Sequence, residues 1–304
     1  MEEKTYLTHD GVSLRYYTIG SDRRAPVVVI TSAPGMSIKF WLPIITALQG
    51  KYAVLGFDYR GFPKEFGHKL TAGDARFDNL VEDLNMILEK ENIEEAHFLS
   101  WCSGAKVMLA FYASYPEKFR SITMLNPAHK TGGGAEKSEF SNVLYGLIDK
   151  VGSDERSIER VLKLMKNIGV VPNADFFDYI KEDESGVAHA LDLADLLIDE
   201  SSYSNLAFYM IDDAITLSNY LKIYEEINKT NVEESFFGLS VATLLLMGEQ
   251  DTISYLTERD RDYIVANESI SWKEIPGGSH FMLIEYPTQI ATEIDRHIET
   301  ILDQ

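Results

Sequence analysis

The sequence predicts an α/β fold in which helices flank a mostly parallel central sheet and a helical insertion interrupts the alternation. Three observations lead to this prediction. Short apolar runs at 27–31, 53–58 and 241–247 are typical of strands buried on both faces of a parallel sheet. Helical patterns separate the strands of the first third. From about residue 129 to 239 the alternation stops, and only helical patterns follow.

The composition is that of an ordinary folded protein. Hydrophobic residues make up 45% of the 304 residues and charged residues 25%, which argues against an intrinsically disordered or fibrous chain. Acidic residues outnumber basic ones by 48 to 28, giving a formal charge of −20. Such a surface repels phosphate backbones and anionic lipid heads, so we expect no nucleic-acid partner and no membrane partner.

Cysteine content and the chain start narrow the class further. Cys102 is the only cysteine, which excludes an intrachain disulfide and a cysteine-rich zinc site. The first residues lack the basic and apolar segments of a secretory signal, and no run of about 18 apolar residues is present. We therefore expect a cytoplasmic protein.

The first elements follow from local patterns. We predict a hairpin over 6–19, strands over 27–31 and 53–58, and helices over 40–48 and 79–91. The hairpin is placed by the Asp10-Gly11 turn. The helix over 79–91 has Leu80, Leu84 and Leu88 on one face and acidic residues on the other.

The segment Ser100-Trp101-Cys102-Ser103-Gly104 joins a strand at 96–99 to a helix at 105–115, and a strand at 121–125 follows. A tight turn between strand and helix forces its central residue into a strained conformation and requires small neighbours. Cys102 would then lie at the carboxyl edge of the sheet, beside a helix N-terminus that stabilises a thiolate. The alternative is that Cys102 is simply a small buried residue, as free cysteines often are.

Two later segments add an acid and a base. Asp251 lies in Gly248-Glu249-Gln250-Asp251, directly after the strand at 241–247. His280 lies in the glycine-rich segment 277–281, 29 positions after Asp251. The chain order is therefore nucleophile, acid, histidine.

This strand–turn–helix motif with that order resembles the α/β-hydrolase fold family, with Cys102 where serine is usual. The resemblance implies a catalytic triad of Cys102, His280 and Asp251. His280 would take the thiol proton and later protonate the leaving group, and Asp251 would hold the imidazole tautomer. Trp101, next to the nucleophile, is expected to contact substrate.

The family also implies an oxyanion hole, formed by the backbone N–H groups of Ser103 and Ala33. Ala33 lies in Thr31-Ser32-Ala33-Pro34-Gly35, which is similar to the family's His-Gly-x-Pro-Gly loop, with Thr31-Ser32 in place of His-Gly. Residues 58–61, Asp-Tyr-Arg-Gly, resemble the family's Asp-x-Arg-Gly turn, for which we expect a structural role.

The resemblance covers residues 1–128 and 240–304, the predicted core, and leaves 129–239 as a helical lid. The lid's aromatic and aliphatic residues suggest an apolar or aromatic acyl substrate, or simply packing of the lid on the core. A basic stripe of Arg156, Arg160, Lys163 and Lys166 suggests docking of an acyl carrier protein or coenzyme A thioester. A solvated helix face is the alternative for this stripe.

The leading hypothesis is an ester or thioester hydrolase that works through an acyl-Cys102 intermediate, because an acyl-cysteine is itself a thioester. A second hypothesis passes the acyl group to an acceptor other than water, as an acyltransferase or cyclase does. A third is a non-catalytic homologue that only binds ligand, which the altered Thr31-Ser32 pair leaves open. No metal and no organic cofactor is expected.

Overall fold

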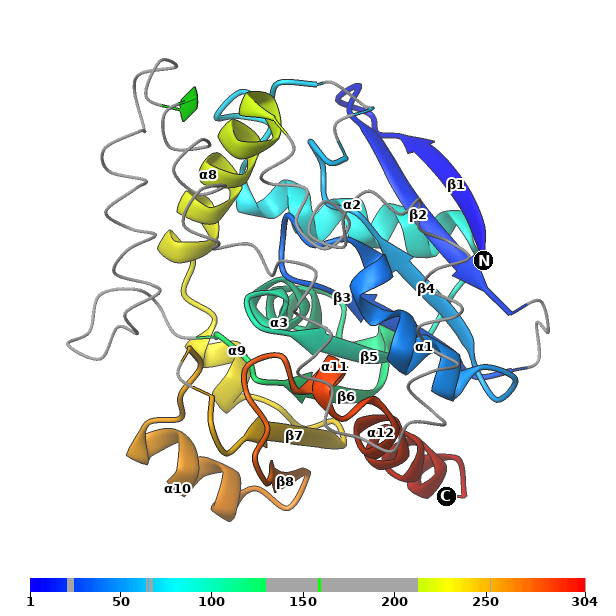
Figure 1. Cartoon of the computed structure of the whole chain (residues 1–304), viewed down its shortest axis with the longest axis vertical. Helices are drawn as coiled ribbons and strands as arrows, with labels where there is room; N and C mark the ends of the chain where they lie inside the picture. Colours follow the sequence, from blue (N-terminus) through cyan, green and yellow to red (C-terminus); the bar gives the residue numbers. More distant parts are fainter. Residues whose placement is uncertain are drawn as a thin grey trace.

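The computed structural model describes residues 1–20, 25–63, 65, 68–129, 158–159, 213–251 and 253–303. An eight-stranded sheet runs through the centre of this part of the chain (Figure 1). Its order is β1-β2-β4-β3-β5-β6-β7-β8. The strands are β1 (Glu2–Leu7), β2 (Ser13–Ile19), β3 (Val27–Thr31), β4 (Ala53–Phe57), β5 (Ala96–Trp101), β6 (Phe119–Leu125), β7 (Thr243–Gly248) and β8 (Ile270–Ile275).

The sheet is antiparallel only at the edge formed by β1 and β2. From β4 to β8 all neighbouring strands are parallel. The apolar runs that predicted strands form the centre of the sheet and are almost completely buried, as in β3 and β7. The predicted α/β fold with a mostly parallel sheet is confirmed, and the carboxyl ends of the parallel strands meet along one edge.

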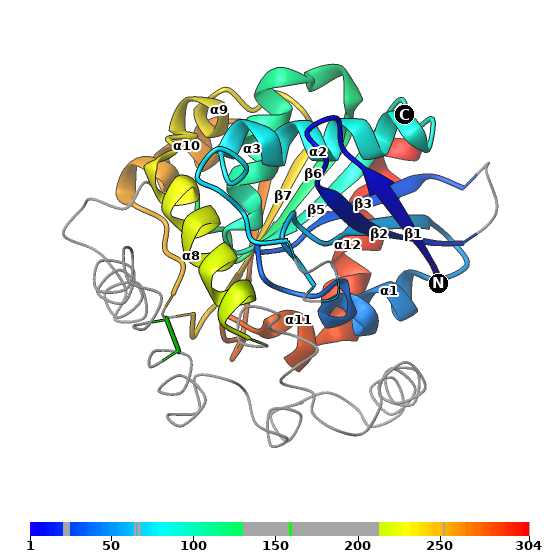
Figure 2. The ribbon, with the colours of Figure 1, turned by 90° about the horizontal axis from the view of Figure 1, so that it is seen from above.

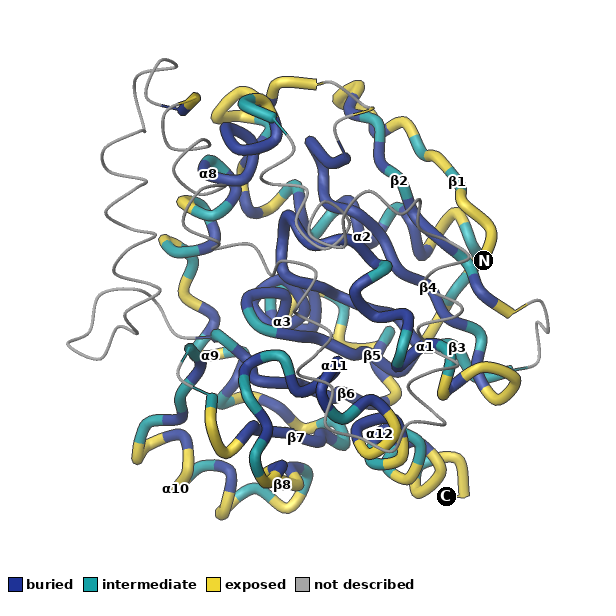
Figure 3. Tube along the Cα trace, viewed as in Figure 1, coloured by how far each residue is buried: buried dark blue, intermediate teal, exposed yellow. Residues whose placement is uncertain are grey.

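Helices cover both faces of the sheet (Figure 2). Helices α2 (Phe77–Lys90) and α3 (Gly104–Ser114) pack together on one face, and α1 (Leu42–Leu48) and α12 (Pro287–Leu302) pack on the other. The remaining described helices are η1 (Ile38–Trp41), η3 (Pro116–Lys118), α8 (Ala214–Lys229), α9 (Glu233–Phe237), α10 (Glu258–Ala266) and α11 (Met282–Glu285). Figure 3 shows buried residues concentrated in the central strands and the inward helix faces.

Helix patterns in the sequence predict which faces are buried. The stripe of Leu80, Leu84 and Leu88 in α2 is buried, and so is the stripe of Ile290, Ile294 and Ile298 in α12. Helix α3 is buried on nearly all sides, because it packs against β3 and β5 of the sheet and against α2 and α9.

The edge strand β8 and the short helices α10 and α11 were not predicted from the sequence. In β8 only Ile270 and Ile275 are buried, and the four residues between them are exposed, including Trp272. A strand exposed on both faces has neither the alternation nor the apolar run that marks a strand in a sequence.

The predicted lid over 129–239 is described only in part. Helix α8 agrees with the helical pattern at 206–227 in its described portion, and α9 follows it. The helical patterns at 154–168 and 188–197, the basic stripe and the aromatic residues at 176–179 and 208–210 lie outside the described residues, apart from Ile158 and Glu159. The division into core and lid stays a prediction. No helix within the described ranges is long and apolar enough to span a membrane.

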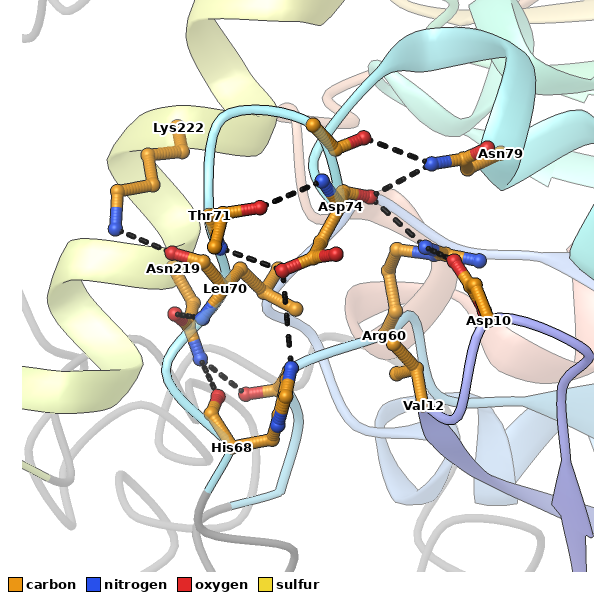
Figure 4. A network of polar contacts seen from close by, with 12 residues as sticks. Asp10, Val12, Arg60, His68, Leu70, Thr71, Asp74, Asn79, Asn219 and Lys222 are labelled. Carbon is orange, nitrogen blue, oxygen red and sulfur yellow. Dashed lines mark hydrogen bonds and ion pairs between the residues drawn. The ribbon is translucent and has the colours of Figure 1, made fainter.

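Helix α8 is held to the core by a polar network (Figure 4). The fully buried Asn219 amide donates to the Gly61 and His68 carbonyls at 3.0 and 2.8 Å and accepts from the Leu70 N–H at 2.9 Å. Lys222 donates to the Leu70 carbonyl at 2.6 Å. The segment after β4 therefore serves as the docking platform for α8.

The turn at residues 58–61 belongs to the same junction. Arg60, which is 1% exposed, forms ion pairs with Asp83 at 2.6 Å and Asp10 at 2.9 Å, and Asp58 pairs with Arg15 at 2.7 Å. Burial raises the pKa of Asp58 to about 6, although the Arg15 charge lowers it. These contacts give the turn the structural role expected from the sequence.

Replacing Asn219 tests the platform. Asn219→Ala removes three hydrogen bonds and leaves the buried Gly61 carbonyl and Leu70 N–H without these partners, so we expect a loss of about 2–4 kcal/mol in the free energy of urea unfolding. The control Lys222→Met removes one bond of a half-buried side chain and should cost less than about 1 kcal/mol. An Asn219→Ala protein as stable as the parent would contradict this account of α8.

Candidate active site

The turn between β5 and α3 carries Cys102 at its crest. Its φ is +53°, a left-handed conformation that non-glycine residues adopt at a cost of about 1–3 kcal/mol. The backbone is fixed by hydrogen bonds on both sides, since Cys102 N–H donates to the Leu125 carbonyl at 3.2 Å and its carbonyl accepts from Ala128 N–H at 3.0 Å. The residue is partly exposed.

Gly104, the second residue after Cys102, lets the turn approach the loop after β3. A Cβ at Gly104 would lie 2.2 Å from the Thr31 carbonyl oxygen and 2.5 Å from that of Ser32. The requirement for a small residue two positions after the nucleophile is thus a backbone contact. It brings the N-terminus of α3 against the segment that contains Ala33.

The two predicted oxyanion donors both lie at this contact. The N–H groups of Ala33 and Ser103 have no acceptor among the described residues, so both are available to a ligand oxygen. The loop turns at Gly35, whose φ is +79°, and Met36 N–H donates to the Ala33 carbonyl at 3.1 Å. Ser32 needs no positive φ, so the glycine of the family pattern is not required by the loop's backbone here.

Thr31 and Ser32 have structural contacts of their own. The Thr31 hydroxyl donates to the Leu99 carbonyl at 3.1 Å and ties β3 to β5. The Ser32 hydroxyl accepts from the indole N–H of Trp41 at 3.2 Å. Both side chains are buried, and their hydrogen bonds hold the loop after β3 against β5 and Trp41.

His280 and Asp251 form a buried pair. The imidazole Nδ1 lies 2.9 Å from Asp251 Oδ2 and 3.1 Å from Oδ1, and His280 is only 4% exposed. Asp251 Oδ1 also accepts from the N–H groups of Ile253 and Ser254, at 2.7 and 3.1 Å. These bonds fix the carboxylate, and the carboxylate in turn favours a proton on Nδ1, which leaves Nε2 for another partner.

Cys102 lies beside this pair. Burial lowers the pKa of His280, but the charge of Cys102 and the hydrogen bonds with Asp251 and Cys102 outweigh it and raise the pKa to about 9. The imidazolium is therefore stable at neutral pH when the sulfur carries a negative charge. The loops that carry Cys102, His280 and Asp251 meet at the carboxyl edge of the sheet, where the ring of Trp101, the residue before Cys102, lies 4.9 Å from the His280 ring.

Trp101 makes contacts that the sequence did not predict. It is 3% exposed, its indole N–H donates to the His280 carbonyl at 2.9 Å, and its ring packs against Phe40 and Phe281. Its visible role is to support the histidine loop, and contact with substrate stays a prediction. Glu285 holds the same loop, because it accepts from the N–H and hydroxyl of Ser279 at 2.7 and 2.6 Å.

Tyr220 on α8 is a buried residue, 6% exposed, that no sequence pattern identified. Burial raises the pKa of its phenol well above the usual range, and the charges of Tyr224 and Cys102 add to this effect. Its ring stacks on Tyr224 with centroids 5.5 Å apart. The sequence offered no signal for Tyr220, because any inward residue of an amphipathic helix has the same spacing.

Metal ligation finds no support in the described part of the chain, where no group of three or more His, Cys, Asp or Glu side chains could hold an ion.

Comparison with known proteins agrees with the fold. A family model described as alpha/beta hydrolase fold matches residues 25–287. The chain is 25% identical over 285 residues to 3-oxoadipate enol-lactonase 1 of Acinetobacter baylyi, which covers 93% of this chain and 92% of the relative.

Two solved structures share the fold. The enol-lactonase from Burkholderia xenovorans LB400 has a TM-score of 0.68 at 17% identity, covering 97% of this chain and 100% of that one. A thermophilic esterase from Thermogutta terrifontis has a TM-score of 0.69 at 15% identity, covering 99% of both chains. At these identities the likeness concerns the fold alone.

Gly104 provides a test of the turn. Gly104→Ala forces a Cβ against two backbone carbonyls, so we expect a loss of about 3 kcal/mol in unfolding free energy or failure to fold. Gly73→Ala is the matched control, since its Cβ would meet only Thr71 Oγ1 at 3.5 Å, and should change stability by less than about 0.5 kcal/mol. Equal stability of the two variants would refute the close approach.

The pKa of His280 tests the placement of the thiol. Nitrogen NMR of the imidazole should give a titration midpoint near pH 9 in the parent protein. Cys102→Ala removes the largest effect that raises this pKa and leaves burial, so the midpoint should move to lower pH. An unchanged midpoint in a folded variant would place the sulfur away from the imidazole.

Proposed function

The chain belongs to the alpha/beta hydrolase fold family, and from this membership we propose that it hydrolyses a carboxylic ester through an acyl intermediate on Cys102. The observation that carries the proposal is the position of the partly exposed Cys102 beside a buried His280–Asp251 pair. A nucleophile, a base and an orienting carboxylate in contact form the arrangement that acyl transfer requires.

In the first half-reaction the Cys102 thiolate attacks the ester carbonyl carbon. The new C–S bond forms as the carbonyl electron pair moves to oxygen, where the N–H groups of Ala33 and Ser103 stabilise the negative charge. Collapse of this tetrahedral species breaks the C–O bond. The leaving alkoxide or enolate takes its proton from the His280 imidazolium.

In the second half-reaction water attacks the Cys102 thioester. Neutral His280 accepts the water proton, and Asp251 stabilises the imidazolium that forms. Collapse of the second tetrahedral species releases the carboxylic acid and restores the thiolate beside the imidazolium. A thiolate is a good leaving group, which suits it to this step.

The substrate class follows from the relatives and from the neighbours of the thiol. A relative that matches over nearly its full length is named as an enol-lactonase, and a lactone is a cyclic ester. Enol esters have stabilised leaving groups, and a thiolate nucleophile is effective on such activated acyl groups. Lactones and enol esters are therefore the first substrates to test. Apolar and aromatic acyl groups come next, because Phe281 lies near the reacting centre.

Steady-state hydrolysis of enol lactones and p-nitrophenyl esters tests the proposal. We expect turnover by the parent protein and a loss of at least about 1,000-fold in kcat/KM for Cys102→Ala and for His280→Gln. Ser114→Ala, at the exposed far end of α3, should retain parental activity. A Cys102→Ala variant within 10-fold of the parent would refute the mechanism.

The same assay separates the alternative functions. An acyltransferase would give an acylated amine, alcohol or thiol when an acceptor is added, with slow hydrolysis in its absence. A binding protein without turnover would be stabilised thermally by the ester and release no product. Either result would replace hydrolysis as the function of this site.

A further inference from the structure

The segment at the end of β6, residues 125–128, contacts the loops of all three proposed triad residues. Its first contact is with the nucleophile turn. Cys102 N–H donates to the Leu125 carbonyl at 3.2 Å, and the Cys102 carbonyl accepts from Ala128 N–H at 3.0 Å. The strained residue is therefore held from both sides by this one segment.

Asn126 links the same segment to the loop of the acid. Its backbone N–H donates to the Leu246 carbonyl at 2.9 Å, and its side-chain Oδ1 accepts from the Gly248 N–H at 2.8 Å. Its own carbonyl accepts from the Ser254 hydroxyl at 2.7 Å. Gly248 and Ser254 lie three positions before and after Asp251, so Asn126 is hydrogen-bonded to the acid loop on both sides of Asp251.

The remaining side-chain group of Asn126 reaches the histidine loop. Its Nδ2 donates to the carbonyls of Ser279 and His280, at 2.9 and 3.1 Å. Asn126 is completely buried and uses its amide as both donor and acceptor. Its φ is +43°, a conformation that asparagine tolerates better than most residues.

We propose that Asn126 is a positioning residue that sets the separation and orientation of Asp251 and His280 relative to Cys102. This inference rests on the proposed function and adds to it a residue outside the triad. Its side-chain amide fixes the distance between the two loops. The amide oxygen accepts from Gly248 in the acid loop, and the amide nitrogen donates to the carbonyl of His280. Loss of the amide leaves the His280 carbonyl with the Trp101 indole N–H, at 2.9 Å, as its remaining side-chain donor among the described residues, and this weaker hold lets His280 shift relative to Asp251.

Direct contacts between the acid and histidine loops provide the competing explanation. Gln250 N–H donates to the Gly278 carbonyl at 2.8 Å, and a Cβ on Gly248 would lie 2.5 Å from the same oxygen. These contacts hold the two backbones together but involve residues before His280. The Asn126 bond to the His280 carbonyl acts on the residue that carries the imidazole.

The test compares Asn126→Gly with Asn92→Gly. Both replace an asparagine of positive φ, +43° and +55°, by the residue that fits this conformation best, and Asn92 lies far from the site, after α2. Asn126→Gly should lower kcat for ester hydrolysis on the order of 10-fold to 100-fold, with KM changed less than about 3-fold. The His280 titration midpoint should also move to lower pH, because its bond to Asp251 weakens. Asn92→Gly should change neither quantity.

Each outcome decides the question. Loss of kcat without movement of the His280 titration would overturn the role at the Asp251–His280 pair, and so would an unchanged kcat and titration. If the parent hydrolyses no ester, the proposed function fails, and the titration alone decides the role of Asn126. If Asn126→Gly does not fold, Ser254→Ala breaks only the bond to the Asn126 carbonyl. It should shift the titration in the same direction by a smaller amount, and no shift would overturn the proposal.

Discussion

The left-handed backbone at Cys102 is the constraint on which the site depends. A cysteine does not adopt a φ of +53° unless its surroundings enforce it. Here the enforcing contacts are two backbone bonds to the segment after β6 and the close approach of Gly104 to the loop after β3. Cys102 is partly exposed at the edge of the sheet, directly before the N-terminus of α3. The same approach brings the loop that contains Ala33 against the turn that contains Ser103, and neither N–H group has an acceptor among the described residues.

The topology supplies the other half of the site. Parallel strands β3, β5, β6, β7 and β8 all end at one edge, so loops far apart in the sequence become neighbours there. His280 is buried between a carboxylate and a thiol, and desolvation alone would favour its neutral form. The two neighbouring groups reverse that preference, which couples the charge of the histidine to that of the sulfur.

The sequence predicted the parts that follow simple patterns. Apolar runs located the central strands, and the small residues around Cys102 located the turn, because backbone contact allows no side chain at Gly104. The strand β8 was missed because its four middle residues are exposed. Asn126 and Tyr220 were missed because their importance lies in contacts more than 100 positions away in the chain, which no local pattern encodes. The bond of Trp101 to the carbonyl of His280 was missed for the same reason, because the two residues are far apart in the sequence.

The most direct measurement of the central claim is intact-protein mass spectrometry on samples quenched during turnover of an activated ester, followed by peptide mapping. The account predicts a mass increase equal to one acyl group, located on the peptide that contains Cys102 and labile to hydroxylamine. Cys102→Ala should show none. Turnover with no adduct at Cys102 under rapid quenching, or an adduct on another side chain that forms at the rate of turnover, would contradict the account.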